Sequence, residues 1–161
     1  EVSRIHIPRY QELNEEINRL VEEINWKYSR DAWSPIVLVR KHISPQEIWA
    51  LYRLANVCIV SSLHDGMNLV AKEFVSARAD LDGVLVLSRF TGAARELREA
   101  LLVNPFDLEQ LADSLHQALT MPLEERKARM ARMREVVRNQ NIYRWAASFL
   151  AELARFPLEE A

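Results

Sequence analysis

The sequence has few of the features that mark specialised classes of protein. Its 161 residues include one cysteine, Cys58, so no internal disulfide can form, which suits a reducing compartment. No apolar run approaches the ~20 residues that a membrane span needs, and the first residues lack a signal-peptide pattern. The net charge of −2 gives no overall attraction to nucleic acid or anionic membranes. We therefore expect a cytoplasmic protein without a nucleic-acid or membrane partner.

Several signatures of catalysis and cofactor binding are also missing. The G-x-G-x-x-G and Walker A patterns are absent, which argues against a nicotinamide-dependent enzyme and a P-loop NTPase. No nucleophile elbow or Ser-His-Asp order occurs. The four histidines and the cysteine lack the spacing of metal ligands, so we predict no structural zinc. The basic run 124–138 carries no interleaved aromatic residues, which disfavours nucleic-acid binding.

What the sequence does contain is an alternation of apolar runs and amphipathic segments. Helical spacing predicts helices over about 9–29, 45–56, 67–78, 107–121, 122–138 and 141–155, with one or two helical turns over 93–99. Apolar runs predict strands at 36–39, 57–60, 84–87 and 100–103. This order predicts an α/β fold with a four-stranded parallel sheet flanked by helices. A complete doubly wound sheet usually has about five or six strands, so one or two are expected upstream.

The same patterns predict which residues form the core. The strand 36–39 is apolar on both faces and is expected to be central and covered by helices on each side. Two helices are expected to turn their apolar residues inward, namely Ile48, Leu51, Tyr52, Leu54, Leu108, Leu111, Leu115, Ala118 and Leu119. The aromatic residues of the first and last helices are expected in the core or at an interface.

The stretch 57–73 has the organisation of a ligand-binding corner. An apolar strand runs into a polar turn with Asp65-Gly66, and a helix begins just afterwards. Ligands of open α/β sheets lie beyond the carboxyl ends of the strands, and the free N–H groups at a helix start favour phosphate. The alternative is an ordinary turn in which Gly66 supplies an unusual φ. A second glycine-bearing corner, 88–92, follows the next strand.

Polar side chains around this corner have the chemistry of sugar ligands. Asp65 and Asn68 are small groups that can bind sugar hydroxyls, and Glu73 lies just over one helical turn beyond Asn68. A carboxylate suits two vicinal ribose hydroxyls, whereas a diphosphate would repel it. Histidines exchange protons near neutral pH, so His64 is either a proton shuttle or only a lining residue of the loop. His42 follows another predicted strand, where it lines the crevice or merely caps and packs.

The string D-G-M-N-L-V-A-K-E at 65–73, behind a buried strand, resembles the donor-site motif of the trehalose-6-phosphate synthases, the retaining glycosyltransferases of family 20. The resemblance covers nearly the whole chain, from about Ser3 to Leu153. Its other parts are Ser3-Arg4 with Tyr10-Gln11, Ile24-Asn25 with Lys27-Tyr28, Trp33 with Pro35, 86–88 with Phe90 and 92–94, and 103–105. These short matches fall in order at fitting distances.

The resemblance implies a GT-B enzyme, in which two Rossmann-like domains face a cleft and no metal is required. Residues 1–161 would form a single Rossmann-like donor-binding domain, the C-terminal half, without the N-terminal acceptor domain and one or two upstream strands. The reaction implied is transfer of glucose from UDP-glucose to glucose 6-phosphate. By this resemblance the transferred glucose is met by Asp65, Gly66, Met67 and Asn68, and the donor-binding segment continues through Leu69, Val70, Ala71 and Lys72. Glu73 binds the ribose, and the Ile43 backbone meets the uracil. Arg4 meets the phosphate of the acceptor.

Alternatives and departures remain beside this interpretation. A glucosylglycerol-phosphate synthase or a pseudo-glycosyltransferase shares the fold, and a non-catalytic nucleotide-binding module would keep the corner. The donor base (UDP, GDP or ADP) is open. His64 stands where the family often has Arg, which would change substrate preference or only the charge of the loop. Expected partners are a nucleotide sugar, a sugar phosphate, the N-terminal domain of the parent chain and, as a further option, a second copy. Alone, this chain should be inactive.

Overall fold

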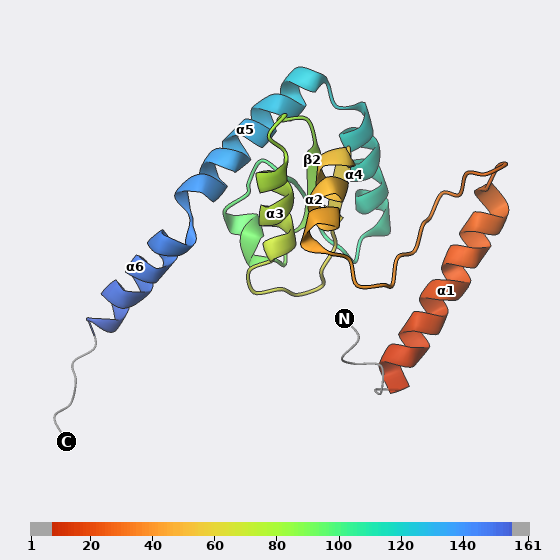
Figure 1. Ribbon diagram of the computed structural model, residues 1–161, viewed down its shortest axis with the longest axis horizontal. Helices are drawn as coiled ribbons and strands as arrows, with labels where there is room; N and C mark the ends of the chain where they lie inside the picture. Colours follow the sequence, from red (N-terminus) through yellow and green to blue (C-terminus); the bar gives the residue numbers. More distant parts are fainter. Residues whose placement is uncertain (1–7, 156–161) are drawn as a thin grey trace. The chain divides into compact units, whose positions relative to one another are not determined.

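The computed structural model of the protein describes residues 8–155 (Figure 1). The chain divides into two compact units, Glu1–Ser44 and Pro45–Ala161. Within residues 8–155, the first unit contains one long helix and an irregular segment, and the second contains the sheet and the remaining helices. Each unit is described by itself.

The first unit is organised around α1 (Pro8–Tyr28), which confirms the helix predicted over 9–29. Asn25 ties the irregular segment to this helix, because its Nδ2 donates to the Ile36 carbonyl and its Oδ1 accepts from the Ile36 N–H, both at 3.0 Å. Further along, the Arg40 guanidinium donates to the Asn14 carbonyl at 3.0 Å. The segment after α1 therefore lies along α1, held by side chains rather than by a strand ladder.

The prediction of a strand at 36–39 was wrong. No strand is present there, the backbone of Ile36 is bonded to a side chain, and Val37 is 80% exposed. An apolar, β-branched run indicates a preference for extended backbone, but a strand forms only where a neighbouring strand completes its hydrogen bonds. Among residues 8–155, none pairs with this run in a ladder. The sheet accordingly has three strands where four were predicted, and 36–39 is not its centre.

The second unit is built on the three-stranded parallel sheet in the order β1-β2-β3. Its strands are β1 (Val57–Val60), β2 (Val84–Ser88) and β3 (Leu101–Val103), within a residue of the predicted strands. Val57 pairs with Val84, and Val86 pairs with Leu101. All five residues of β2 are buried. An apolar run buried on both faces is what a parallel sheet covered by helices requires.

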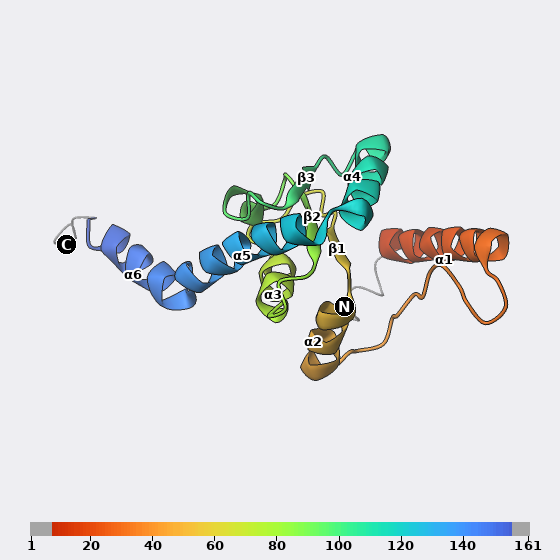
Figure 2. The ribbon, with the colours of Figure 1, turned by 90° about the horizontal axis from the view of Figure 1, so that it is seen from above.

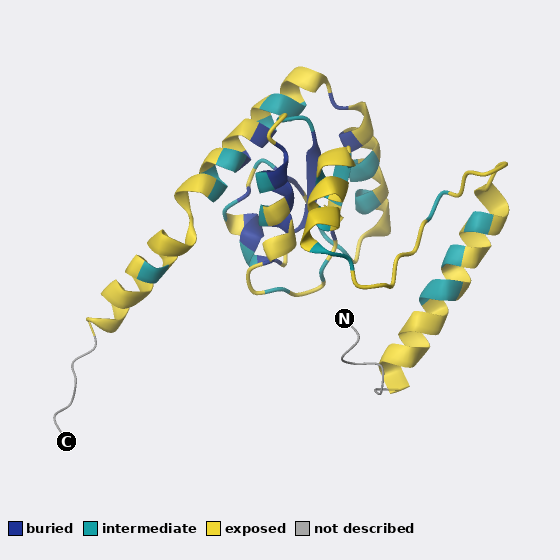
Figure 3. Ribbon diagram, in the orientation of Figure 1, coloured by how far each residue is buried: buried dark blue, intermediate teal, exposed yellow. Residues whose placement is uncertain are grey.

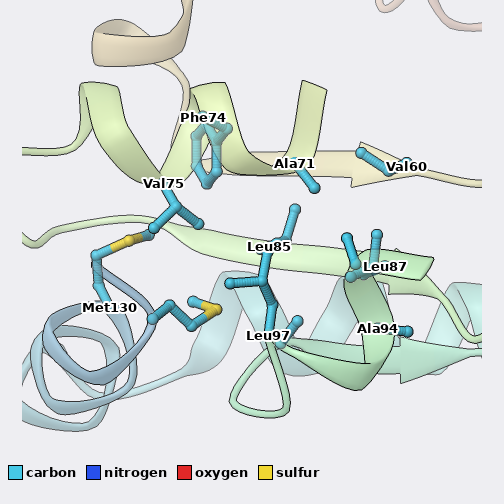
Figure 4. Packing of buried hydrophobic residues seen from close by; sticks show 12 residues of the cluster. Val60, Ala71, Phe74, Val75, Leu85, Leu87, Ala94, Leu97 and Met130 are labelled. Carbon is cyan, nitrogen blue, oxygen red and sulfur yellow. The ribbon is translucent and has the colours of Figure 1, made fainter. Parts of the chain in front are cut away.

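Helices cover both faces of this sheet (Figure 2). The helices of this unit are α2 (Pro45–Leu54), α3 (Leu69–Ala77), the 3₁₀ helix η2 (Gly92–Arg95), α4 (Leu108–Thr120), α5 (Leu123–Asn139) and α6 (Ile142–Leu153), and the last of these has no buried residue and does not cover the sheet. On one face, Leu85 and Leu87 pack with Phe74 of α3 and Met130 of α5 (Figure 4). On the other face, Val84 and its neighbours pack against α4. No helix in the described part of the chain is long and apolar enough to cross a membrane.

Several residues predicted to face the core are exposed instead (Figure 3). Ala118 is buried and Leu111 and Leu115 are half-buried, as expected, but Leu54 is 78% and Leu108 75% exposed. Leu51 and Leu119 are exposed too. Trp145 and Phe149 of α6, from a helix whose aromatic residues were expected in the core or at an interface, are exposed and not in the core, and their rings stack at 5.5 Å. Helical periodicity identifies an apolar face, but it does not say whether another element covers that face.

Candidate functional site

Two loops meet beyond the carboxyl ends of β1 and β2. The Asp65 N–H donates to the Phe90 carbonyl at 3.3 Å, and the Gly92 N–H donates to the Asp65 carbonyl at 3.1 Å. These bonds form an isolated parallel bridge between Asp65 and Thr91. The Ala93 N–H also donates to the Met67 carbonyl at 3.0 Å. The two glycine-bearing corners predicted from the sequence are thus one joined structure, which the sequence did not reveal.

The two glycines of this joined structure have different roles from those expected. A Cβ atom on Gly92 would overlap the Gly66 carbonyl oxygen, so only glycine allows the two loops to approach this closely. Gly66 has open space around its missing Cβ and no positive φ. The interpretation that Gly66 supplies an unusual φ was therefore wrong. The left-handed residue is Asn68, with a φ of 64°.

Asp65 and Asn68 hold the corner in shape. Asp65 Oδ1 accepts from the N–H groups of Met67 at 3.2 Å and Asn68 at 2.9 Å, while Oδ2 accepts from Asn68 Nδ2 at 3.0 Å. Asn68, which is buried, caps α3 because its Oδ1 accepts from the Ala71 N–H at 2.9 Å. Asparagine tolerates the left-handed region better than most residues. These side chains are thus engaged with the backbone of the loop itself.

The start of α3 offers unpaired donors to a ligand. Leu69 and Val70 are its first two residues, and their N–H groups have no acceptor within the described ranges. These two residues are 61% and 44% exposed, so the helix end is open to solvent. Ala71 differs, because its side chain is buried and its N–H is already bonded to Asn68. The positive end of the helix dipole and two free N–H groups together suit an anion such as phosphate.

Glu73 lies on the second turn of α3 and is exposed. The Tyr52 hydroxyl of α2 donates to Glu73 Oε2 at 3.2 Å. Burial is the larger cause that raises the pKa of Tyr52 to about 12, and the negative charge of the neighbouring Glu73 carboxylate is the second. The phenol is therefore protonated at neutral pH and can donate a hydrogen bond. The sequence analysis placed Tyr52 only among core residues. No local motif marks it, because the contact joins residues 21 positions apart.

Lys72 forms an ion pair with Glu96. Its Nζ lies 2.9 Å from Glu96 Oε2 and 3.0 Å from Oε1, and both side chains are more than half buried. Lys72 was expected within the donor segment through the family resemblance, whereas Glu96 was not singled out. The pair connects α3 to the segment just after η2. A buried lysine charge is tolerable there because the carboxylate neutralises it.

A cavity of about 750 Å³ opens above the joined loops. Its lining combines the corner with residues that the sequence analysis missed, and it consists of His64, Asp65, Gly66, Met67, Arg89, Phe90, Thr91, Gly92, Arg95, Glu96 and Trp145. Arg89 lies within the second glycine corner, 88–92, and Arg95 follows three residues after it, so that corner was the sequence signal that pointed to this part of the lining. The structure therefore puts His64 beside the corner, among groups of both charges.

Two expected site residues are not among the described residues of the second unit, which carries the corner. Ile43, which is half-buried, belongs to the first unit, as does His42, and Arg4 lies outside the described residues. No group of three or more His, Cys, Asp or Glu residues between 8 and 155 is arranged to hold a metal. Cys58 is unpaired and half-buried in β1, and burial raises the pKa of its thiol to about 11. The thiol is therefore protonated at neutral pH.

The chain resembles known proteins over almost its entire length. The model of the glycosyltransferase family 20 matches residues 1–155. The trehalose-6-phosphate synthase of Enterobacter sp. (strain 638) is 42% identical over 154 residues, which are 95% of this chain and 32% of that protein. The chain therefore spans about a third of the length of this relative.

Solved structures agree with the sequence comparison. An E. coli structure with bound UDP-2-fluoro glucose is 39% identical, with a TM-score of 0.89 over 94% of this chain and 34% of that one. A trehalose-phosphate synthase from Burkholderia xenovorans in complex with glucose 6-phosphate is 42% identical, with a TM-score of 0.90 over 94% and 33%. This similarity confirms the predicted α/β fold with a parallel sheet flanked by helices. The chain belongs to glycosyltransferase family 20, as the motif at 65–73 indicated.

Proposed function

We propose that this chain is the donor-binding part of a retaining glycosyltransferase that transfers glucose from UDP-glucose to glucose 6-phosphate, giving trehalose 6-phosphate and UDP. The observation that carries the proposal is the open start of α3, where the N–H groups of Leu69 and Val70 are unpaired beside a loop lined with sugar-binding chemistry. The ligands of the two solved relatives, UDP-2-fluoro glucose and glucose 6-phosphate, support this substrate pair.

The donor diphosphate would lie against the start of α3. Breaking the bond between glucose C1 and the phosphate oxygen leaves negative charge on UDP, which the two free N–H groups and the helix dipole stabilise. The acceptor hydroxyl forms the new bond to C1 on the same face, and its proton passes to the departing phosphate oxygen. We expect no metal to be required, because the helix end supplies the positive potential.

The two ends of the donor would be bound by different residues. The corner Asp65, Gly66, Met67 and Asn68 would meet the glucose, and its hydrogen bonds fix the loop before the sugar arrives. Glu73 would accept hydrogen bonds from the vicinal ribose hydroxyls, a role that suits an exposed carboxylate close to the same helix end. Lys72 would contribute through its ion pair with Glu96, which supports the loops.

The other contacts would complete the site. We propose that residues 1–161 form one donor-binding domain, in which the Ile43 backbone meets the uracil and Arg4 meets the acceptor phosphate. Because the chain spans about a third of the length of its relatives, the remaining length of a full enzyme would supply the acceptor domain and, as the family resemblance implies, an upstream Arg and Lys that neutralise the diphosphate. Residues 1–161 without those groups should bind the donor weakly and transfer no glucose.

The test is a transfer assay on the full-length enzyme. UDP-glucose and GDP-glucose are each offered to glucose 6-phosphate and glycerol 3-phosphate, and the sugar product and nucleoside diphosphate are measured. We expect trehalose 6-phosphate with UDP-glucose. If product forms with glycerol 3-phosphate and not with glucose 6-phosphate, the enzyme is a glucosylglycerol-phosphate synthase instead. Absence of transfer in every combination would refute the proposal and favour a pseudo-glycosyltransferase or a binding module.

A further inference from the structure

The end of α2 is fastened to α3 by a buried arginine. Arg78 follows α3, and its side chain is almost fully buried. Its Nη1 donates to the carbonyl oxygens of Tyr52 at 3.2 Å and Ala55 at 2.9 Å, and to that of Arg53 as well. These carbonyls are the unpaired acceptors that a helix leaves at its C-terminus. The backbone of Tyr52 is therefore fixed relative to α3, the helix that carries Glu73.

The ring of Tyr52 is fixed as well. It packs edge-to-face on Phe74, with the ring centroids 6.2 Å apart and an interplanar angle of 79°. Phe74 is fully buried in the core and directly follows Glu73 in the sequence. Edge-to-face packing stabilises a tyrosine ring beyond the area that it buries. Backbone and ring together direct the Tyr52 hydroxyl to Glu73 Oε2.

We propose that Tyr52 is a positioning residue for the nucleotide donor, and that its phenol holds the Glu73 carboxylate by Oε2 so that Oε1 is available to the ribose. The inference rests on the proposed function of Glu73 in ribose binding. Oε1 has no hydrogen-bond partner within the part of the chain that the structure describes. An unrestrained glutamate must lose rotamer freedom on binding, so restraint before binding lowers the dissociation constant.

The test uses the full-length enzyme with Tyr52→Phe, which keeps the ring on Phe74 and removes only the hydroxyl. Isothermal titration calorimetry measures the dissociation constants of UDP and of 2′-deoxyuridine diphosphate, which lacks one of the vicinal hydroxyls. We expect the constant for UDP to rise about fivefold, the usual scale for losing a hydrogen bond to a charged group at a partly exposed site. The 2′-deoxy compound should lose less, so that discrimination between the two falls. Tyr143→Phe, on a tyrosine that is 82% exposed, is the matched control and should change neither constant.

Kinetics and a second variant separate the possible failures. In the variant Tyr52→Phe, KM for UDP-glucose should rise while kcat changes little, because the ribose is remote from the reacting bond. If Glu73→Ala leaves UDP binding unchanged, the ribose assignment itself fails. If Glu73→Ala weakens binding but Tyr52→Phe does not, only the positioning role is refuted. Equal losses for both nucleotides in the Tyr52→Phe variant would indicate a loosened helix and would also overturn the inference.

Discussion

The left-handed cap at Asn68 allows a quantitative prediction. Replacing it with alanine removes the bond to the Ala71 N–H and the bond to Asp65 Oδ2, and it places a residue without a polar side chain at a φ of 64°. Loss of a helix cap costs about 1 kcal/mol. The second bond, to a charged group, adds about 1 kcal/mol, and the left-handed backbone about 1 kcal/mol more. We expect Asn68→Ala to lower the free energy of unfolding by about 3 kcal/mol in all.

Two matched variants isolate the backbone contribution. Asn68→Gly loses the same two bonds but accepts the positive φ, so it should cost about 2 kcal/mol. Asn141 caps α6 with ordinary extended backbone, at a φ of −85°, and Asn141→Ala should cost about 1 kcal/mol. Urea unfolding of the four proteins measures these differences. The reasoning fails if Asn68→Ala is no more harmful than Asn141→Ala, or if glycine at position 68 is no better than alanine.

Three further predictions follow from the same region. Gly92→Ala should separate the two loops, lower the unfolding midpoint clearly and weaken donor binding, whereas Gly66→Ala, in open space, should change stability little; equal effects would contradict the loop contact. Burial raises the pKa of Cys58 to about 11, so iodoacetamide at pH 8 should label it slowly until urea exposes it. The pKa of Tyr52 is raised from 10.0 to about 12, so the contribution of its protonated phenol to the free energy of unfolding is complete below pH 10 and is lost as the pH rises through 12. Tyr52→Phe should remove that part of the decline in stability at alkaline pH.

The parts of the fold that local patterns encode were predicted correctly. β1, β2 and β3 are buried apolar runs, and α4 begins at a recognisable cap, Asp107, so each was found within about two residues. The run 36–39 was misassigned because its pattern is equally that of a strand, and the pattern says nothing about whether a partner is adjacent. The exposed Leu54 and Leu108 show the same limit for helices, since periodicity does not identify what covers a face.

The candidate site was predictable in position but not in construction. The turn at Asp65-Gly66 and a helix starting at about residue 67, two residues before the observed start at Leu69, follow from the strand, the turn and the family motif. The sequence pointed to Gly66 as the special backbone position, whereas Asn68 takes the positive φ and Gly92 allows the close approach. Those facts depend on two loops meeting in space. The link from Tyr52 to Glu73 is equally invisible, because it depends on how α2 packs on α3.

The bridge between Asp65 and Thr91 has a consequence for engineering this site. Because the β1–α3 loop shares backbone hydrogen bonds with the segment 90–93, we expect the two pieces of chain to be exchangeable only together. Transplanting residues 61–68 from a relative with another donor preference would import only one of the two pieces. A chimera should tolerate the exchange when both pieces come from the same parent, and a mixed pair should lose the fit at Gly92.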